Sequence, residues 1–189
     1  VILNNEQKSG ITFHLMDEHY DTGAILAQEE IKIFPSDTGK SLKERTVLTA
    51  RGVVCELLKD LNEDIIIPLT QSEEKSSYYS YPSDLELDFS KSASENAALI
   101  RAIYPWGNAY FYNEIMCLIA EAHGIEICEN NTTYTHAGTV TECDYKNKII
   151  GILCADNKIL RFHVNHLKKF DRPFISSYLK HSITVGEII

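Results

Sequence analysis

The chain has few of the features that mark membrane, secreted or nucleic-acid-binding proteins. Its apolar runs are far shorter than the roughly 20 residues that a membrane-spanning helix needs, and Pro68 interrupts the longest of them. No basic segment followed by an apolar core opens the sequence, so we expect no signal peptide. The net charge of −9 gives no general attraction to nucleic acid, and the basic cluster of Lys168, Lys169 and Arg172 is only local.

The cysteines also lack the spacing of a disulfide framework or a zinc site. There are five of them, an odd number, and no Cys-x-x-Cys pair occurs. His163 and His166 are spaced like two metal ligands, but no third ligand accompanies them, so we expect no metal. This cysteine usage is typical of the reducing cytosol, and we expect a cytoplasmic protein.

The composition is that of an ordinary globular protein. Apolar residues make up 44% of the 189 residues and charged residues 24%, and the length suits one medium domain or two small ones. A polar connector follows the Ile-Ile-Ile-Pro segment and runs into three nearby tyrosines. We therefore predict a first domain over residues 1–62, a linker over 63–80 and a second domain over 81–189.

Two strands and a long helix are predicted in the first domain. Apolar residues occur on both faces of residues 11–16, which is typical of an internal strand of an α/β sheet. A second strand is expected over residues 24–34. Residues 35–38 offer side-chain oxygens that can cap a helix, and the apolar residues of 39–61 recur at helical spacing. We expect this helix to pack on the sheet.

The second domain begins with a helix and continues with short strands. Ser92 or Ser94 is expected to cap a helix that runs through Arg101. Short apolar segments separated by turn residues follow at regular intervals. Several short strands closed by turns predict a small β-barrel. The expected strands are residues 109–112, 115–122, 137–143, 149–154 and 159–164.

The most informative segment is residues 9–23. It is predicted to be a strand that runs into a tight acidic turn and ends in Asp21-Thr22-Gly23. A carboxylate at a strand-end turn, with His14 seven residues before it, suits proton-transfer chemistry. From position alone, however, such an aspartate is more often a turn residue that accepts bonds from nearby amides. A lone histidine on an apolar strand is likewise more often a hydrogen-bonded core residue.

This segment resembles the folate-dependent formyltransferases, which include methionyl-tRNA, sugar N- and glycinamide ribonucleotide formyltransferases. Two stretches carry the resemblance, Gly10 to Leu42 and Asp88 to Phe111, and with later matches it covers roughly residues 10–62 and 78–165. It implies an α/β partial Rossmann-like formyltransferase domain, followed by a small OB-like β-barrel domain. The first half of the family's catalytic domain supplies most of its folate pocket. That half has no counterpart here, so we expect the chain to be part of a longer protein.

The resemblance implies transfer of a formyl group from 10-formyltetrahydrofolate to a primary amine. The amine would belong to methionyl-tRNA, an amino sugar nucleotide or a carrier-bound aminoacyl group. Asp21 would manage the proton movements and His14 would share its pocket. An aspartate starts from a pKa of about 3.9, so it acts as an acid only where burial raises that value.

The acidic turn itself is expected to contact the cofactor. By resemblance, Asp17, Glu18, His19 and Tyr20 present backbone groups to the pterin, although a solvated acidic turn is the simpler interpretation. The alternative function for the whole chain is a non-catalytic binding or assembly module that remains after loss of the folate-binding half. The sequence leaves homo-oligomerisation open.

Overall fold

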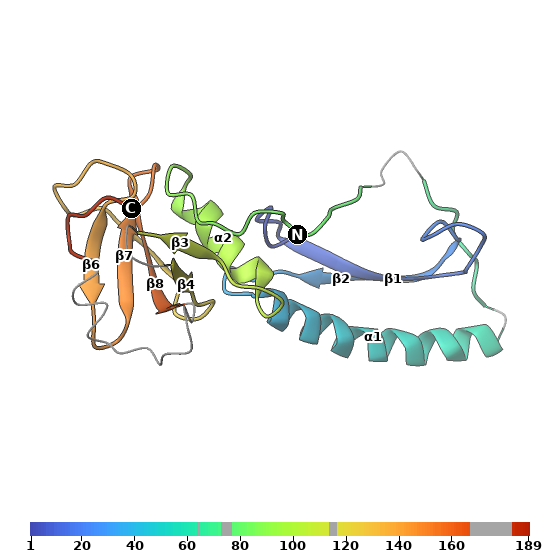
Figure 1. Cartoon of the computed structure of the whole chain (residues 1–189). Helices are drawn as coiled ribbons and strands as arrows, with labels where there is room; N and C mark the ends of the chain where they lie inside the picture. Colours follow the sequence, from blue (N-terminus) through green and yellow to red (C-terminus); the bar gives the residue numbers. More distant parts are fainter. Residues whose placement is uncertain (64, 73–76, 114–116, 167–182) are drawn as a thin grey trace. The chain divides into compact units, whose positions relative to one another are not determined.

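The computed structural model of the chain describes all residues except 64, 73–76, 114–116 and 167–182. It divides into two compact units, here called unit 1 (Val1 and Glu6–Pro82) and unit 2 (Ile2–Asn5 and Ser83–Ile189) (Figure 1). In the described part of the chain, neither helix is long and apolar enough to cross a membrane. The basic cluster at residues 168–172 lies outside the described residues.

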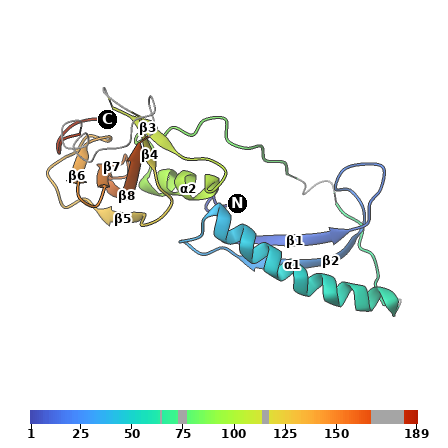
Figure 2. The same ribbon diagram turned by 60° about the horizontal axis from the view of Figure 1, so that its bottom comes forward.

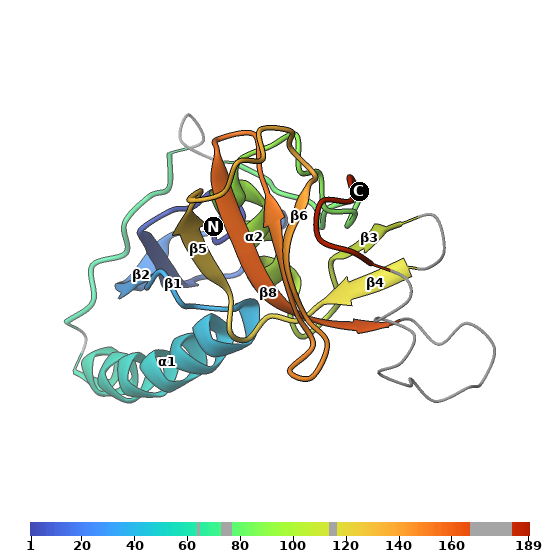
Figure 3. The ribbon, with the colours of Figure 1, turned by 90° about the vertical axis from the view of Figure 1, so that its left-hand side faces the viewer.

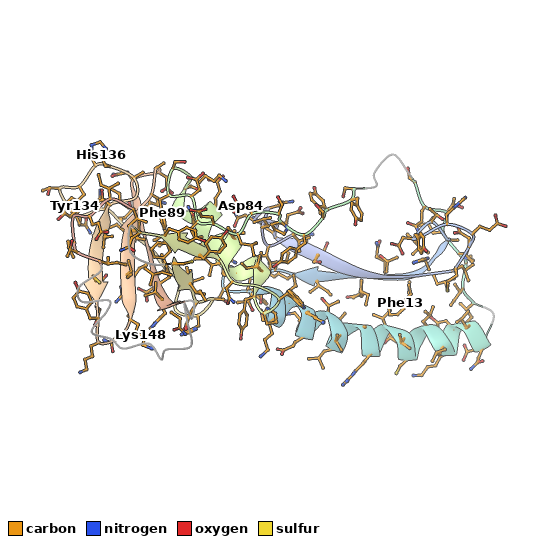
Figure 4. All side chains as sticks on the ribbon, viewed as in Figure 1. Phe13, Asp84, Phe89, Tyr134, His136 and Lys148 are labelled. Atoms are coloured by element: carbon orange, nitrogen blue, oxygen red, sulfur yellow. The ribbon has the colours of Figure 1, made fainter. Side chains whose placement is uncertain are left out.

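The described residues of unit 1 form a two-stranded antiparallel sheet with one helix. Strand β1 (Lys8–His14) pairs with β2 (Ile25–Lys32), and α1 (Gly39–Asn62) contacts both strands. The helix runs along one side of the strands in two views (Figures 1 and 2). Phe13 lies on the side of the sheet that faces the helix (Figure 4). The two strands and the helix of the first domain are thus confirmed, with bounds within a few residues of the prediction.

The expectation of a strand covered on both faces is wrong for the described residues. Along β1, exposed residues alternate with half-buried ones, which is the pattern of a strand covered on one face only. The outward face is polar: Lys8 forms an ion pair with Glu30, and Gln28 donates to Thr12. The prediction failed because it counted Thr12 with the apolar pattern and extended the strand past His14.

The start of α1 is fixed by side chains that the sequence places just before and within its first turns. Thr38 caps the helix and exchanges bonds with Ser41 in a capping box. Asp37 is 4% exposed and accepts from both terminal nitrogens of Arg45, from the Phe34 N–H and from the Ser41 hydroxyl. Arg45 also donates to the Lys32 carbonyl. These contacts tie the end of β2 to the helix.

A second apolar stripe on α1 is left uncovered by the described residues. Leu42 is buried, and Val53 and Leu57 are half-buried on the sheet side of the helix. Val47 and Leu58, by contrast, are 46% and 57% exposed. At 3.6 residues per turn these two lie on one side of the helix, beside the sheet-facing stripe. Unit 1 therefore buries only part of the apolar surface of its helix.

The described residues of unit 2 form the second helix and six strands. Helix α2 (Ala93–Ile103) is capped by Ser92, the first of the two serines predicted for that role. Five of the six described strands overlap segments predicted from the sequence, whereas β5, whose four residues are all exposed, was not predicted. The strands are β3 (Tyr110–Tyr112), β4 (Cys117–Ala120), β5 (Glu126–Glu129), β6 (Val140–Asp144), β7 (Ile149–Leu153) and β8 (Lys158–His166).

These strands form one antiparallel sheet in the order β3-β4-β8-β7-β6, with β5 beside the first half of β8 (Figure 3). Within the described residues, the outer strands β3 and β6 do not pair with each other, so a closed barrel is not confirmed. Each outer strand is instead extended by a single bridge near its end, Glu86 to Tyr110 on one side and Thr139 to Ile188 on the other.

The core of unit 2 lies between α2 and the sheet. Phe111 forms edge-to-face contacts with Phe89 and Phe162, at ring-centroid distances of 5.6 and 5.9 Å. Ile100 and Ile103 of α2 are almost fully buried in the same cluster. The stick view shows Phe89 inside this unit (Figure 4). Because burying such side chains removes a large apolar area from water, this cluster is the main source of stability in unit 2.

Removal of the Asp37 charge is expected to loosen α1 in a pH-dependent way. The bonds from Arg45, Phe34 and Ser41 lower the pKa of Asp37 from 3.8 to about 2. A pKa that is lower in the folded state stabilises the protein above pH ~4, and the effect disappears as the pH falls towards 2. We expect Asp37→Asn to lower the free energy of unfolding by roughly 2 kcal/mol near neutral pH, measured by urea denaturation followed through the helical circular dichroism.

The exposed Glu56 of the same helix provides the control. Glu56→Gln is expected to leave the free energy of unfolding nearly unchanged both near neutral pH and at about pH 2. If Asp37→Asn destabilised the protein equally near neutral pH and at about pH 2, the charge of Asp37 would not be the cause.

Candidate active-site turn

The turn between β1 and β2 brings together the two residues singled out as catalytic candidates. A register shift between Phe13 and His14 ends the regular pairing of the strands. His14 Nε2 lies 3.6 Å from the Asp21 carboxylate, and His14 Nδ1 lies 2.7 Å from the Leu15 carbonyl oxygen. Because only a protonated nitrogen can bond a carbonyl oxygen, Nδ1 carries the hydrogen and Nε2 faces Asp21.

The two side chains differ in their exposure to solvent. His14 is 25% exposed, whereas the Asp21 side chain is 95% exposed. Asp21 also has a φ of 59°, in the left-handed region that favours glycine and asparagine. The burial that would let Asp21 act as an acid is therefore not provided by the described residues.

Asp17 closes the acidic turn with its side chain. It accepts two short contacts from the Thr22 hydroxyl, at 2.7 and 2.9 Å, and one bond from the His19 N–H at 3.0 Å. The bond from Thr22 is the main reason that the pKa of Asp17 is lowered, followed by the bond from His19. Sequence reasoning gave Asp17 a cofactor contact through its main chain, whereas the structure shows its side chain holding the turn together.

The remaining turn residues point into solvent. Glu18, His19 and Tyr20 are all exposed, and Tyr20 is 99% exposed. Of their backbone groups, the His19 N–H is already bonded to the Asp17 carboxylate. A cavity of about 280 Å³ lies in unit 2 and is lined by residues of that unit only, among them Phe89, Phe111 and Tyr112.

Gly23 is required by a close backbone approach. A Cβ atom at this position would lie 1.7 Å from the carbonyl oxygen of Leu15, far inside any allowed contact. Next to this contact, the Leu15 N–H donates a hydrogen bond to the Ala24 carbonyl at 2.9 Å, which joins the two sides of the turn. The Gly in the Asp-Thr-Gly sequence thus has a steric role, because the turn closes only where no side chain intervenes.

Gln71 is a site residue that sequence reasoning missed. Its side-chain Nε2 donates to the Asp21 carbonyl at 3.0 Å and to the Gly23 carbonyl at 2.6 Å. Just before it, Leu69 and Ile25 exchange both backbone bonds at 2.8 Å. Residues 63–80 were expected to be a linker, and no local pattern in the sequence distinguishes Gln71 from other polar residues there. Only the return of the chain to the turn shows its role.

A metal centre finds no support in the described residues. Among them, no group of three or more histidine, cysteine, aspartate or glutamate side chains is placed to hold an ion. His163, one of the two histidines with ligand-like spacing, stacks on His123 with 4.9 Å between the ring centroids.

Two family models match the chain. The model described as Formyl transferase matches residues 1–57, which include the whole turn, and the model Formyl transferase, C-terminal domain matches residues 80–171. The chain belongs to the formyltransferase family. The two matches account for most of the chain and divide it close to the boundary between units 1 and 2.

The relatives are longer than this formyltransferase chain. It is 30% identical to the methionyl-tRNA formyltransferase of Caldanaerobacter subterraneus over its full length, which covers 60% of that protein. Identity to the Clostridium novyi methionyl-tRNA formyltransferase is 32%, over 82% of this chain and 49% of the relative. The chain thus spans about half the length of such curated relatives.

Solved structures confirm the formyltransferase fold. An N-formyltransferase from Helicobacter canadensis aligns with a TM-score of 0.66 at 21% identity, over 87% of this chain and 58% of that one. The sugar 3N-formyltransferase WlaRD aligns with a TM-score of 0.65 at 22% identity, over 89% of this chain and 58% of that one. HypX from Aquifex aeolicus gives 0.60 at 16% identity, over 89% of this chain and 29% of that one.

Gly23→Ala is expected to open the turn. Because the added methyl group would overlap the Leu15 carbonyl, the backbone must move, at a cost of about 1–3 kcal/mol. We expect a lower melting temperature and changed NMR shifts for the amides of Leu15 and Ala24.

Gly52→Ala is the matched control. Its Cβ would meet nothing within 4 Å. In the middle of α1 it should stabilise the protein by about 0.5–1 kcal/mol. Unchanged amide shifts at the turn in Gly23→Ala would show that the close approach is not a real constraint.

Proposed function

We propose that this chain is the part of a formyltransferase that carries its proton-transferring carboxylate, and that the complete enzyme moves a formyl group from 10-formyltetrahydrofolate to a primary amine. The single observation that carries the proposal is the pairing of His14 with Asp21 on a turn held closed from several sides. Membership of the formyltransferase family supplies the reaction class.

The reaction needs one net proton transfer. The neutral amine attacks the formyl carbon and forms a new C–N bond, after which the bond from that carbon to the folate nitrogen breaks. The amine nitrogen loses a proton and the departing folate nitrogen gains one. Asp21 is the group that accepts and returns this proton, directly or through a water molecule. Nε2 of His14 faces this carboxylate at 3.6 Å and attracts it only when the imidazole is protonated, because neutral His14 carries its hydrogen on Nδ1.

Neutral His14 does not meet one requirement of this chemistry. The tetrahedral intermediate carries a negative oxygen that needs a hydrogen-bond donor. Nδ1–H of His14 is already used by the Leu15 carbonyl, so neutral His14 has no donor for this oxygen. We therefore propose that the oxyanion donor is a group other than neutral His14.

The exposure of unit 1 supports the same conclusion. Formyl transfer requires a site that excludes water, yet the Asp21 side chain is 95% exposed. The apolar stripe of α1 that includes Val47 and Leu58 is also uncovered. Both surfaces fit a larger catalytic domain in which further formyltransferase residues cover the turn and the helix.

Solved relatives support the folate donor. The Helicobacter canadensis N-formyltransferase is described in complex with folinic acid and dTDP-3-aminofucose, and HypX from Aquifex aeolicus with tetrahydrofolic acid. In our proposal, the backbone of the exposed turn residues Glu18, His19 and Tyr20 faces the pterin of this donor. The free cysteines of the chain support a cytoplasmic location for the reaction.

Two classes of acceptor fit the relatives. The sequence relatives cited above are methionyl-tRNA formyltransferases, while the solved structures include a sugar 3N-formyltransferase. The net charge of −9 and a histidine at position 14 favour a small amino sugar nucleotide or a carrier-bound acceptor over tRNA. A non-catalytic binding module is the alternative, favoured by the exposure of Asp21 in this chain alone.

Asp21→Asn in the full-length gene product tests the proposal. An amide keeps the shape of the side chain but cannot take up a proton at neutral pH, so we expect formyl transfer to be lost while the melting temperature stays nearly unchanged. The assay supplies 10-formyltetrahydrofolate with methionyl-tRNA or a dTDP-amino sugar and follows the formylated product by mass spectrometry.

Asp60→Asn, an exposed aspartate on α1, is the matched control and should retain full activity. Full activity of Asp21→Asn would remove this carboxylate from the mechanism. A wild-type protein inactive with both acceptors would favour the non-catalytic alternative.

A further inference from the structure

The chain segment that follows α1 returns to the active-site turn. Leu69 pairs with Ile25 at the start of β2, on the edge of that strand that does not face β1. This short antiparallel bridge places Gln71 beside the turn. A segment that sequence reasoning assigns to a linker is therefore built into unit 1.

The Gln71 amide is matched to the two carbonyls that it meets. An amide nitrogen has two hydrogens, and Nε2 contacts two acceptors, the carbonyl oxygens of Asp21 and Gly23. These carbonyls flank Thr22, whose hydroxyl is in turn bonded to Asp17. The backbone on both sides of Thr22 is thus held by side chains from two separate parts of unit 1.

Asp21 depends on its backbone for its orientation. Its φ of 59° is unfavourable for a residue with a Cβ, at a cost of about 1 kcal/mol or more, so surrounding contacts must hold it. The carboxylate is exposed and approaches His14 only at 3.6 Å, which is too long for a strong hydrogen bond. The bond from Gln71 to the carbonyl of the same residue is shorter and acts directly on the backbone.

We propose that Gln71 is a positioning residue that holds the Asp21 backbone so that the carboxylate faces the reacting groups. This role rests on the proposed formyl transfer. Gln71 touches neither donor nor acceptor in this scheme and acts only through the turn. Its removal therefore lowers the rate of the chemical step and leaves the affinity for the folate donor nearly intact.

Gln71→Glu in the full-length protein provides the test. The substitution keeps the size of the side chain but replaces both donors with a carboxylate that repels the two carbonyls. Two hydrogen bonds are lost, so we expect kcat to fall about tenfold to a hundredfold while KM for 10-formyltetrahydrofolate changes less than about twofold. Gln71→Met removes the donors without adding charge, and we expect it to lower kcat as much as Gln71→Glu does.

Gln28→Glu is the matched control. Gln28 also donates through its amide, but to Thr12 on the outer face of the sheet, within the regular pairing of β1 and β2. We expect its kcat to equal that of the wild type.

Three outcomes would overturn the positioning role. The first is a normal kcat in Gln71→Glu. The second is a loss of kcat in this variant that is absent when the assay is run well below its melting temperature, which would indicate partial unfolding. The third is a rise in KM for 10-formyltetrahydrofolate in place of a fall in kcat. Each of these leaves the proposed function intact as long as the wild type is active and Asp21→Asn is not. A wild-type protein inactive with every acceptor would remove the reaction and the positioning role together.

Discussion

The turn of unit 1 depends on the close approach of the Gly23 backbone to the Leu15 carbonyl. A Cβ atom at position 23 would lie 1.7 Å from that oxygen, so the turn closes only around a glycine. Closure brings the end of β1 against the start of β2, and the Leu15 N–H then reaches the Ala24 carbonyl. The meeting of His14 and Asp21, seven residues apart, follows from this single contact.

Around that contact, the side chains of Asp17, Thr22 and Gln71 hold the backbone of the turn. Asp17 holds Thr22, and Gln71 holds the carbonyls on both sides of it. The carboxylate of Asp21 forms no comparable bond and stays exposed. A rigid backbone with one exposed carboxylate is the arrangement expected where a side chain must be placed accurately and still be open to a ligand.

The two units differ in how complete they are. Unit 2 buries a continuous cluster of aromatic and aliphatic side chains between α2 and its sheet. In its described residues, unit 1 has two strands, and its helix exposes Val47 and Leu58. A two-stranded sheet is marginally stable by itself, so packing against α1 and the ion pair of Asp37 with Arg45 carry much of its stability. The chain covers 49% and 60% of the two methionyl-tRNA formyltransferases cited above.

Local sequence signals determined the elements of the fold and the family to which the chain belongs. The capping residues Thr38 and Ser92, the helical spacing of α1 and the Asp21-Thr22-Gly23 turn all act between near neighbours, so they can be recognised without a structure. Tertiary structure decided the rest: the exposed outer face of β1, the open sheet of unit 2 and the bond from Gln71 to a turn 50 residues away. Contacts between segments that are far apart in the sequence depend on the path of the whole chain, and a local sequence pattern does not determine that path.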